Sequence, residues 1–182
     1  MREQIAMSQY DEICDFAIAN YGLVSTAQAA DMGVARKDIG EWVKLGRLDR
    51  LGRGVYRIAH YYPTEYDQYA LAVALVGEGS YIWGDSVLAM HNLALVNPLH
   101  VFVATNNRVR RTLPNWIKLV KMPKGARVEV FEGIPCQKLA DVLREARGKI
   151  LTERLQGAVE EAERKGLMKI HEIEDLRKEL RR

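Results

Sequence analysis

Apolar residues recur at helical spacing in three short segments near the start of the chain. Residues 8–20 carry apolar positions on one face, which predicts a first helix. Ser25 is a good N-cap with Gln28 at the capping-box position, and Gly33 stands where a left-handed residue closes a helix. A third helix is expected from about Ala35 to Leu45, with its apolar residues on one face.

A short hairpin should follow these helices. Residues 48–51 and 55–58 are two apolar-polar runs, joined by Gly52-Arg53-Gly54, where glycines supply positive φ. Helix, tight glycine turn, helix and basic-tipped hairpin is the order of a winged helix-turn-helix, whose second helix enters the major groove of DNA. We predict this domain over residues 1–62.

Residues 63–182 have a mixed pattern. A largely apolar helix is expected over 64–77 with Thr64 as its N-cap, and a second over 86–95, capped by Asp85 or Ser86. Short β-branched runs predict strands over 80–83, 99–105, 117–122, 127–132 and 134–139, and amphipathic runs predict helices over 140–147, 152–165 and 171–180. The fold class is therefore α+β: a winged helix-turn-helix, then a small mixed domain with C-terminal helices.

Charge is unevenly distributed along the chain, although the net charge is only +3. Residues 34–58 hold seven basic and three acidic residues, and residues 106–127 hold seven basic and no acidic ones. Residues 1–33 and 59–105 are acidic overall. Two basic blocks between acidic segments are typical of one or two surfaces that face phosphates.

The first basic block coincides with the second helix and the wing. Arg36 and Lys37 lie in the first helical turn, where side chains reach base edges, and Arg53 lies at the wing tip. The predicted DNA contacts are Ser25, Thr26, Arg36, Lys37, Lys44, Arg47, Arg50, Arg53 and Arg57. The alternative is a protein-docking module whose charged faces are merely solvated, but bases on helix and wing together favour DNA.

The second basic block joins two expected strands. Arg108, Arg110, Arg111 and Lys118 form a predicted second basic surface. It could hold a second stretch of nucleic-acid backbone, an RNA or an acidic protein, or it could be an exposed loop without a partner.

Nothing in the sequence calls for catalysis or a cofactor. P-loop, GxSxG and HExxH motifs are missing, and the four histidines lack a partner at metal-ligand spacing, so we expect no metal, no cofactor and no enzyme. His91 lies among apolar residues, as a core or boundary histidine would. Cys14 and Cys136 stand far apart, which predicts reduced thiols in a cytoplasmic protein, and no apolar run approaches the ~20 residues of a membrane span.

The segment GLVSTAQAADMGVARKDIGEWVKLGRLDRLGRGVYRI closely resembles the N-terminal winged helix of AbiEi-type antitoxins, from type IV toxin–antitoxin (abortive infection) systems. The residues that carry the resemblance are Gly22, Thr26–Ala29, Gly33–Arg36, Leu45–Leu48, Arg50 and Gly54–Arg57. It continues through TEYDQYALAVALVGEGSYIWGDSVLAMHNL, where Val87 and Asn92 replace the family's Ala and Gly, and through GIPCQKLADVL.

The resemblance implies a bacterial or archaeal cytoplasmic regulator encoded beside a nucleotidyltransferase-like toxin. Its winged helix would bind inverted repeats in its own promoter as double-stranded DNA and repress the operon. The C-terminal domain would counter the toxin, in general without a stable complex. On the family pattern, Arg36, Lys37, Arg47, Arg53 and Arg57 are the DNA candidates. Two other classes stay open: a protein-interaction module that blocks the toxin directly, and an enzyme that modifies it.

Overall fold

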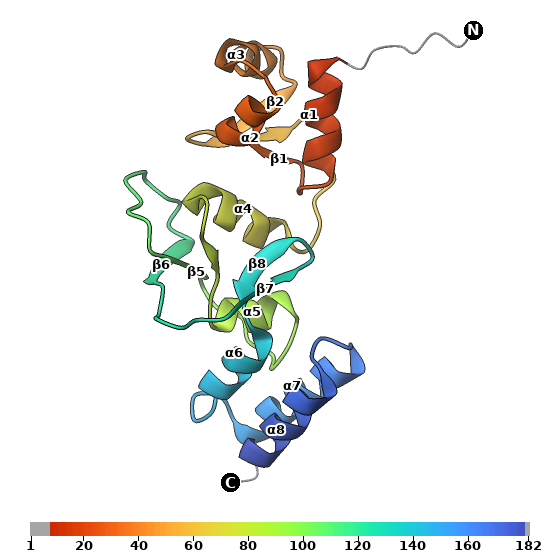
Figure 1. Ribbon diagram of the computed structural model, residues 1–182, viewed down its shortest axis with the longest axis vertical. Helices are drawn as coiled ribbons and strands as arrows, with labels where there is room; N and C mark the ends of the chain where they lie inside the picture. The colour runs from red at the N-terminus through yellow and green to blue at the C-terminus, as the bar shows by residue number, and fades with distance from the viewer. Residues whose placement is uncertain (1–7, 181–182) are drawn as a thin grey trace, which may run out of the picture. The chain divides into compact units, whose positions relative to one another are not determined.

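The structure is a computed structural model that describes residues 8–180. The chain divides into two compact units, residues 1–75 and 76–182. The helices and strands of each are labelled in Figure 1. The division falls at the end of the long apolar helix that we expected to open the second domain. The expected boundary after residue 62 stays a prediction, and residues 1–7 and 181–182 of the expected domains lie outside the described range.

The first unit is a winged helix-turn-helix, as predicted. Its elements are α1 (Gln9–Ile18), β1 (Leu23–Ser25), α2 (Thr26–Asp31), α3 (Arg36–Lys44), β2 (Leu48–Gly52), β3 (Val55–Ile58) and α4 (Asp67–Val76). The strands form an antiparallel sheet in the order β1-β3-β2. The core draws one or more residues from each of the first six elements, including Ile13, Val24, Ala29, Ile39, Leu48 and Ile58.

Local signals in the sequence explain the turn between α2 and α3. The Ser25 hydroxyl accepts the Gln28 N–H (3.1 Å), and the Gln28 side chain accepts the Ser25 N–H (2.8 Å), so the capping box is complete. Gly33 has φ +79°, and the N–H of Val34 then reaches back to the carbonyl of Ala29 at 2.9 Å. This closure satisfies the last carbonyls of α2 and lets α3 begin within a few residues.

The second unit combines a five-stranded mixed sheet with helices. Its elements are β4 (Tyr81–Ile82), α5 (Asp85–Met90), β5 (Val101–Thr105), β6 (Ile117–Lys121), β7 (Val128–Phe131), β8 (Ile134–Gln137), α6 (Leu139–Glu145), α7 (Thr152–Arg164) and α8 (Ile170–Leu180). The strand order is β6-β5-β4-β8-β7, with β5–β6 and β4–β8 parallel and the other pairs antiparallel. Helix α8 packs against α6 and α7. The α+β class is therefore confirmed.

Two predicted helix starts differ from the structure. Helix α4 begins at Asp67, because a turn at Thr64 comes first, in which the Asp67 carboxylate accepts the Thr64 N–H at 2.8 Å. Helix α5 is capped by Gly84 and not by Asp85 or Ser86. Ser86 is fully buried instead, and its hydroxyl accepts the N–H of Phe102 at 2.8 Å, so it ties α5 to β5.

Among residues 8–180, no helix has the length and apolarity that a membrane span needs.

Candidate nucleic-acid interface

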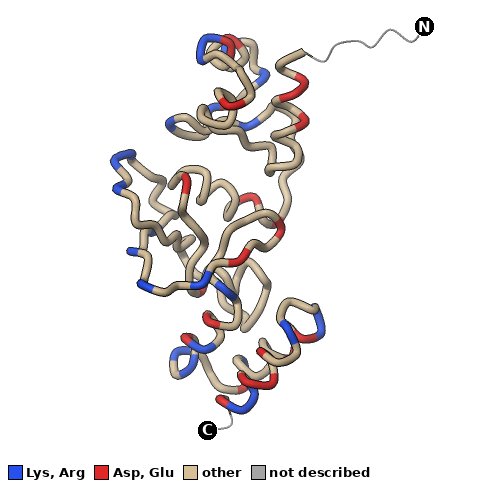
Figure 2. The backbone as a smooth tube through the Cα atoms, in the orientation of Figure 1, with Lys and Arg blue, Asp and Glu red and all other residues tan. Residues whose placement is uncertain are grey.

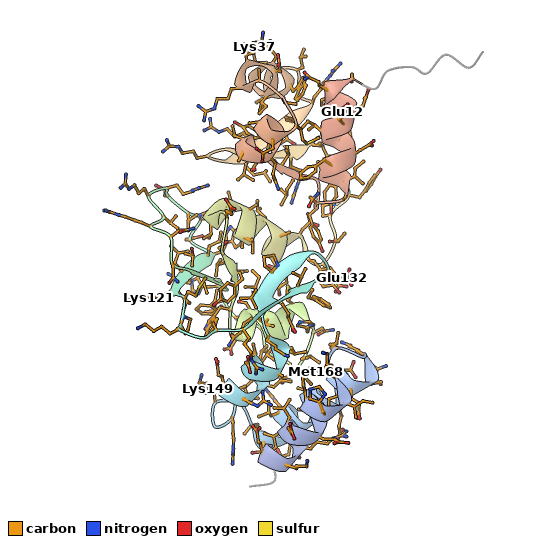
Figure 3. All side chains as sticks on the ribbon, viewed as in Figure 1. Glu12, Lys37, Lys121, Glu132, Lys149 and Met168 are labelled. Carbon is orange, nitrogen blue, oxygen red and sulfur yellow. The ribbon has the colours of Figure 1, made fainter. Side chains whose placement is uncertain are left out.

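Helix α3 has one buried and one exposed face. Ile39 is only 3 % exposed and belongs to the core, whereas Arg36, Lys37, Gly40 and Lys44 are exposed. Figure 3 shows Lys37 at the outer surface of this helix. Arg36 and Lys37 are the first two helical residues, so both project from the end of α3 that reads bases in helix-turn-helix proteins.

Towards its end, the exposed face of α3 also carries an acidic residue, Glu41. The ammonium of Lys44 lies 2.8 Å from the Glu41 carboxylate, and this hydrogen bond raises the pKa of Lys44. Both side chains are largely exposed, so the pair contributes little to stability and can be exchanged for a phosphate contact. Two of the three basic residues of α3, Arg36 and Lys37, therefore lie in its first turn, next to the acidic Asp38.

An aromatic contact holds the segment after α3. The Tyr10 ring meets Trp42 edge to face, with 5.2 Å between centroids, and the Arg47 guanidinium lies 5.0 Å above the Tyr10 ring. The Tyr10 hydroxyl also donates to the Arg47 carbonyl at 3.2 Å. Burial, with smaller contributions from Cys14, raises the pKa of Tyr10 to about 12, so the hydroxyl stays a donor. Arg47 is exposed, and its contacts with Tyr10 fix its orientation. Its guanidinium is therefore available for a contact with the DNA backbone.

The wing is the β2–β3 hairpin. A β-bulge between Arg50 and Gly52 bends β2 next to the turn, and Arg53 lies exposed in the turn. Gly54 has φ +74°, and a Cβ there would lie 3.2 Å from the hydroxyl oxygen of Thr26. The Thr26 N–H also donates to the Gly54 carbonyl at 2.9 Å. The start of α2 and the wing tip are therefore fixed to each other.

Arg57 has a different environment from the other predicted contacts. Its guanidinium pairs with the Asp67 carboxylate at 2.9 Å, and the two side chains are 20 % and 12 % exposed. It also lies over the Tyr61 ring, 5.4 Å from the centroid. The same carboxylate accepts the Tyr61 hydroxyl (3.2 Å) and both donors of Thr64 (2.8 and 3.0 Å). Arg57 thus ties the chain after the wing to β3, and its direct contact with DNA stays a prediction.

Figure 2 shows how charge is arranged within the first unit. Lys and Arg lie on α3, together with two acidic residues, and at the tip of the hairpin, whereas α1 carries Asp and Glu. Anionic DNA would therefore be attracted to the face formed by α3 and the wing and repelled from α1.

Residues 11–59 match the model of a protein family described as Transcriptional regulator, AbiEi antitoxin. Over these residues the winged unit matches an AbiEi-type regulator domain. The match runs from α1 to the residue after β3, so it includes all nine predicted DNA contacts. It confirms the resemblance seen in the sequence for this segment. A search of curated proteins found no match to the chain.

Outside the AbiEi-type domain match, the second basic block lies at one edge of the mixed sheet. Arg108 and Arg110 are exposed in the segment between β5 and β6, and Arg111 is half-buried in it. Lys118 is exposed on β6, and Lys121, which the prediction omitted, is exposed at the end of that strand (Figure 3). Because β6 is an edge strand, lysines there also prevent pairing with another chain.

Two further features of the winged unit concern its interface. Gly40 lies on the exposed face of α3, with no atom within 4 Å of the place a Cβ would occupy. Glycine destabilises the interior of a helix, so a glycine at this place indicates a packing or functional role. The cluster of Arg57 with Asp67 had no local signal, because its two members come from different elements.

Proposed function

We propose that this protein is an autorepressor that binds an inverted repeat in the promoter of its own operon through the winged unit. The observation that carries the proposal is the separation of faces on α3: Ile39 anchors the helix in the core, and Arg36 and Lys37 stand exposed at its first turn. The match to the regulator family over the same segment supports it.

In this proposal α3 lies in the major groove and the wing follows the adjacent backbone. Arg36 and Lys37 contact base edges, where Arg and Lys pair best with guanine. Lys44, Arg47, Arg50 and Arg53 contact phosphates, together with Ser25 and Thr26 at the start of α2. Contacts to ~5–8 phosphates supply most of the affinity, and the bases supply the choice of site.

A single winged unit reads only a few base pairs, so we propose that two chains bind the two halves of the repeat. Half-sites about one helical turn apart would place both recognition helices on the same side of the duplex.

We also propose that the second unit has an antitoxin role. The family description names an antitoxin, and the second unit is then the part that would oppose a nucleotidyltransferase-like toxin, without a stable complex. The exposed Arg108, Arg110 and Lys118, with Arg111, are the surface that we assign to this role. Co-purification of the chain with the product of the neighbouring gene would contradict the absence of a stable complex.

Replacing Gly40 by alanine tests whether the exposed face of α3 lies against DNA. The substitution should stabilise the free protein by about 0.5–1 kcal/mol, because alanine favours a helix and has open space here. If the groove wall approaches this face, the added methyl group should weaken operator binding by at least about 10-fold, or ~1.4 kcal/mol. Thermal unfolding and a DNA titration measure the two effects.

Gly157→Ala is the matched control for this change. Gly157 is an exposed glycine inside α7, again with no atom near the added Cβ. It should gain similar stability and bind DNA like the wild type. A Gly40→Ala protein with unchanged DNA affinity would show that DNA does not approach this face closely.

A further inference from the structure

Three metal-ligating side chains meet in the second unit. His91 follows α5 as its C-cap residue, Glu129 is on β7 and Cys136 is on β8. Glu129 and Cys136 are directly opposite each other in the antiparallel β7–β8 pair, so their side chains share one face of the sheet. The ligand atoms of all three residues lie within 4.8 Å of one another.

The His91 ring is a buried polar group without a partner. The residue is 5 % exposed, and neither ring nitrogen has a hydrogen-bond partner among the described residues. A neutral imidazole offers one donor and one acceptor, and buried groups of this kind are nearly always satisfied. The ring packs on Phe131, with 3.9 Å between centroids, but this contact uses neither nitrogen. The polar side of His91 therefore needs a ligand.

We propose that His91, Glu129 and Cys136 bind a structural Zn²⁺ ion that ties the β7–β8 hairpin to the end of α5. Zinc accepts imidazole, thiolate and carboxylate ligands together, whereas Mg²⁺ and Ca²⁺ prefer oxygen ligands alone. One thiolate and one carboxylate neutralise the two charges of the ion, so a largely buried cluster carries no net charge. A tetrahedral zinc would need one further ligand, which a water molecule would have to supply.

The surroundings of the cluster fit this proposal. One Glu129 oxygen accepts the Leu139 N–H at 2.8 Å, which orients the carboxylate and leaves its other oxygen for the ion. Lys165 donates to the His91 carbonyl at 3.2 Å and pairs with the Glu161 carboxylate at 3.3 Å. Glu161 is also paired with Arg164.

Small side-chain movements are sufficient to form the site. Ligand atoms around a tetrahedral zinc lie about 3.3–3.8 Å apart, which follows from bonds of about 2.0–2.3 Å. The observed spread of up to 4.8 Å must therefore shorten by about 1 Å.

No pattern in the sequence indicates this site, because the spacing of its residues matches no zinc motif. His91 and Glu129 are 38 positions apart, and the prediction of no metal site rested on neighbours along the chain. Only the pairing of β7 with β8 and the end of α5 bring the three together.

Cobalt titration of the full-length protein tests the proposal. The protein is first dialysed against a chelator and then titrated with Co²⁺, which reports thiolate ligation through a charge-transfer band and tetrahedral geometry through visible d–d bands. We expect both bands to saturate at one Co²⁺ per chain and Zn²⁺ to displace them. Zn²⁺ should also raise the unfolding temperature.

The two cysteines supply a matched pair of variants. Cys136→Ser should lose the charge-transfer band and bind Zn²⁺ at least about 100-fold more weakly, whereas Cys14→Ser, in the first unit, should behave like the wild type. If Cys136→Ser fails to fold, Glu129→Gln provides a second test, because Glu129 is only half-buried. The Glu129→Gln protein should also bind Zn²⁺ more weakly than the wild type. Folded wild-type protein without a charge-transfer band, or a band that depends on Cys14, would overturn the proposal.

Discussion

The double variant Arg36→Ala/Lys37→Ala is expected to bind operator DNA about 100-fold more weakly than the wild type, a loss of ~2.7 kcal/mol. Both side chains are exposed in the first turn of α3 and are placed to contact base edges. Affinity for random DNA should fall less, because only the charge contribution is lost there. Competition between operator and random duplexes in a binding assay measures the difference.

Removal of two positive charges elsewhere is the control for this variant. Arg154 and Lys169 are exposed basic residues of the second unit, and the Arg154→Ala/Lys169→Ala protein has the same net charge as the helix variant. It should keep its preference for the operator. An equal loss in both variants would mean that overall charge, and not the first turn of α3, decides the affinity.

Arg57→Ala is expected to lower the free energy of unfolding of the first unit by about 2–3 kcal/mol. The guanidinium is mostly buried against the Asp67 carboxylate, and its removal leaves that carboxylate without its cation. The segment from Tyr61 to Thr64, which hydrogen-bonds the same carboxylate, would loosen from β3 as a consequence. Urea unfolding followed by Trp42 fluorescence, with Trp83 and Trp116 replaced by phenylalanine, reports on this unit alone.

Arg50→Ala is the matched control, because Arg50 is an exposed arginine directly opposite Tyr56 on the same hairpin. Its effect on unfolding should stay within about 0.5 kcal/mol. Should Arg57→Ala unfold like the wild type yet lose operator binding, Arg57 would be a DNA contact and not an anchor. The sequence alone cannot separate these roles, since both require an arginine at this place.

Features set by a few neighbouring residues could be predicted from the sequence. The capping box of Ser25 and Gln28, the left-handed Gly33 and the positive φ of Gly54 in the wing turn each act within about four residues, and each is present in the structure. Gly52, which was also expected to have a positive φ, belongs to β2 and does not have one. They were sufficient to recognise the winged helix-turn-helix and to place Arg36 and Lys37 at the start of its second helix.

Features that depend on distant residues could not be predicted. The parallel β5–β6 pair has no helix in its connection, and the order of the mixed sheet depends on which strands meet in space. Ser86 matched a cap in the local pattern but is used to join α5 to β5. His91 shows the same limit, because its neighbours Glu129 and Cys136 come from other elements.

The most direct test of the central claim is a fluorescence-anisotropy titration of the wild-type protein with the DNA upstream of its own gene. We predict binding at least about 1000-fold tighter than to random DNA. Two chains should bind each duplex. A plot of the logarithm of the association constant against the logarithm of the salt concentration should have a slope of about −4.5 to −7, as expected for ~5–8 phosphate contacts. Equal affinity for upstream and random DNA would contradict the account, and α3 with the wing would then be a surface for a protein partner.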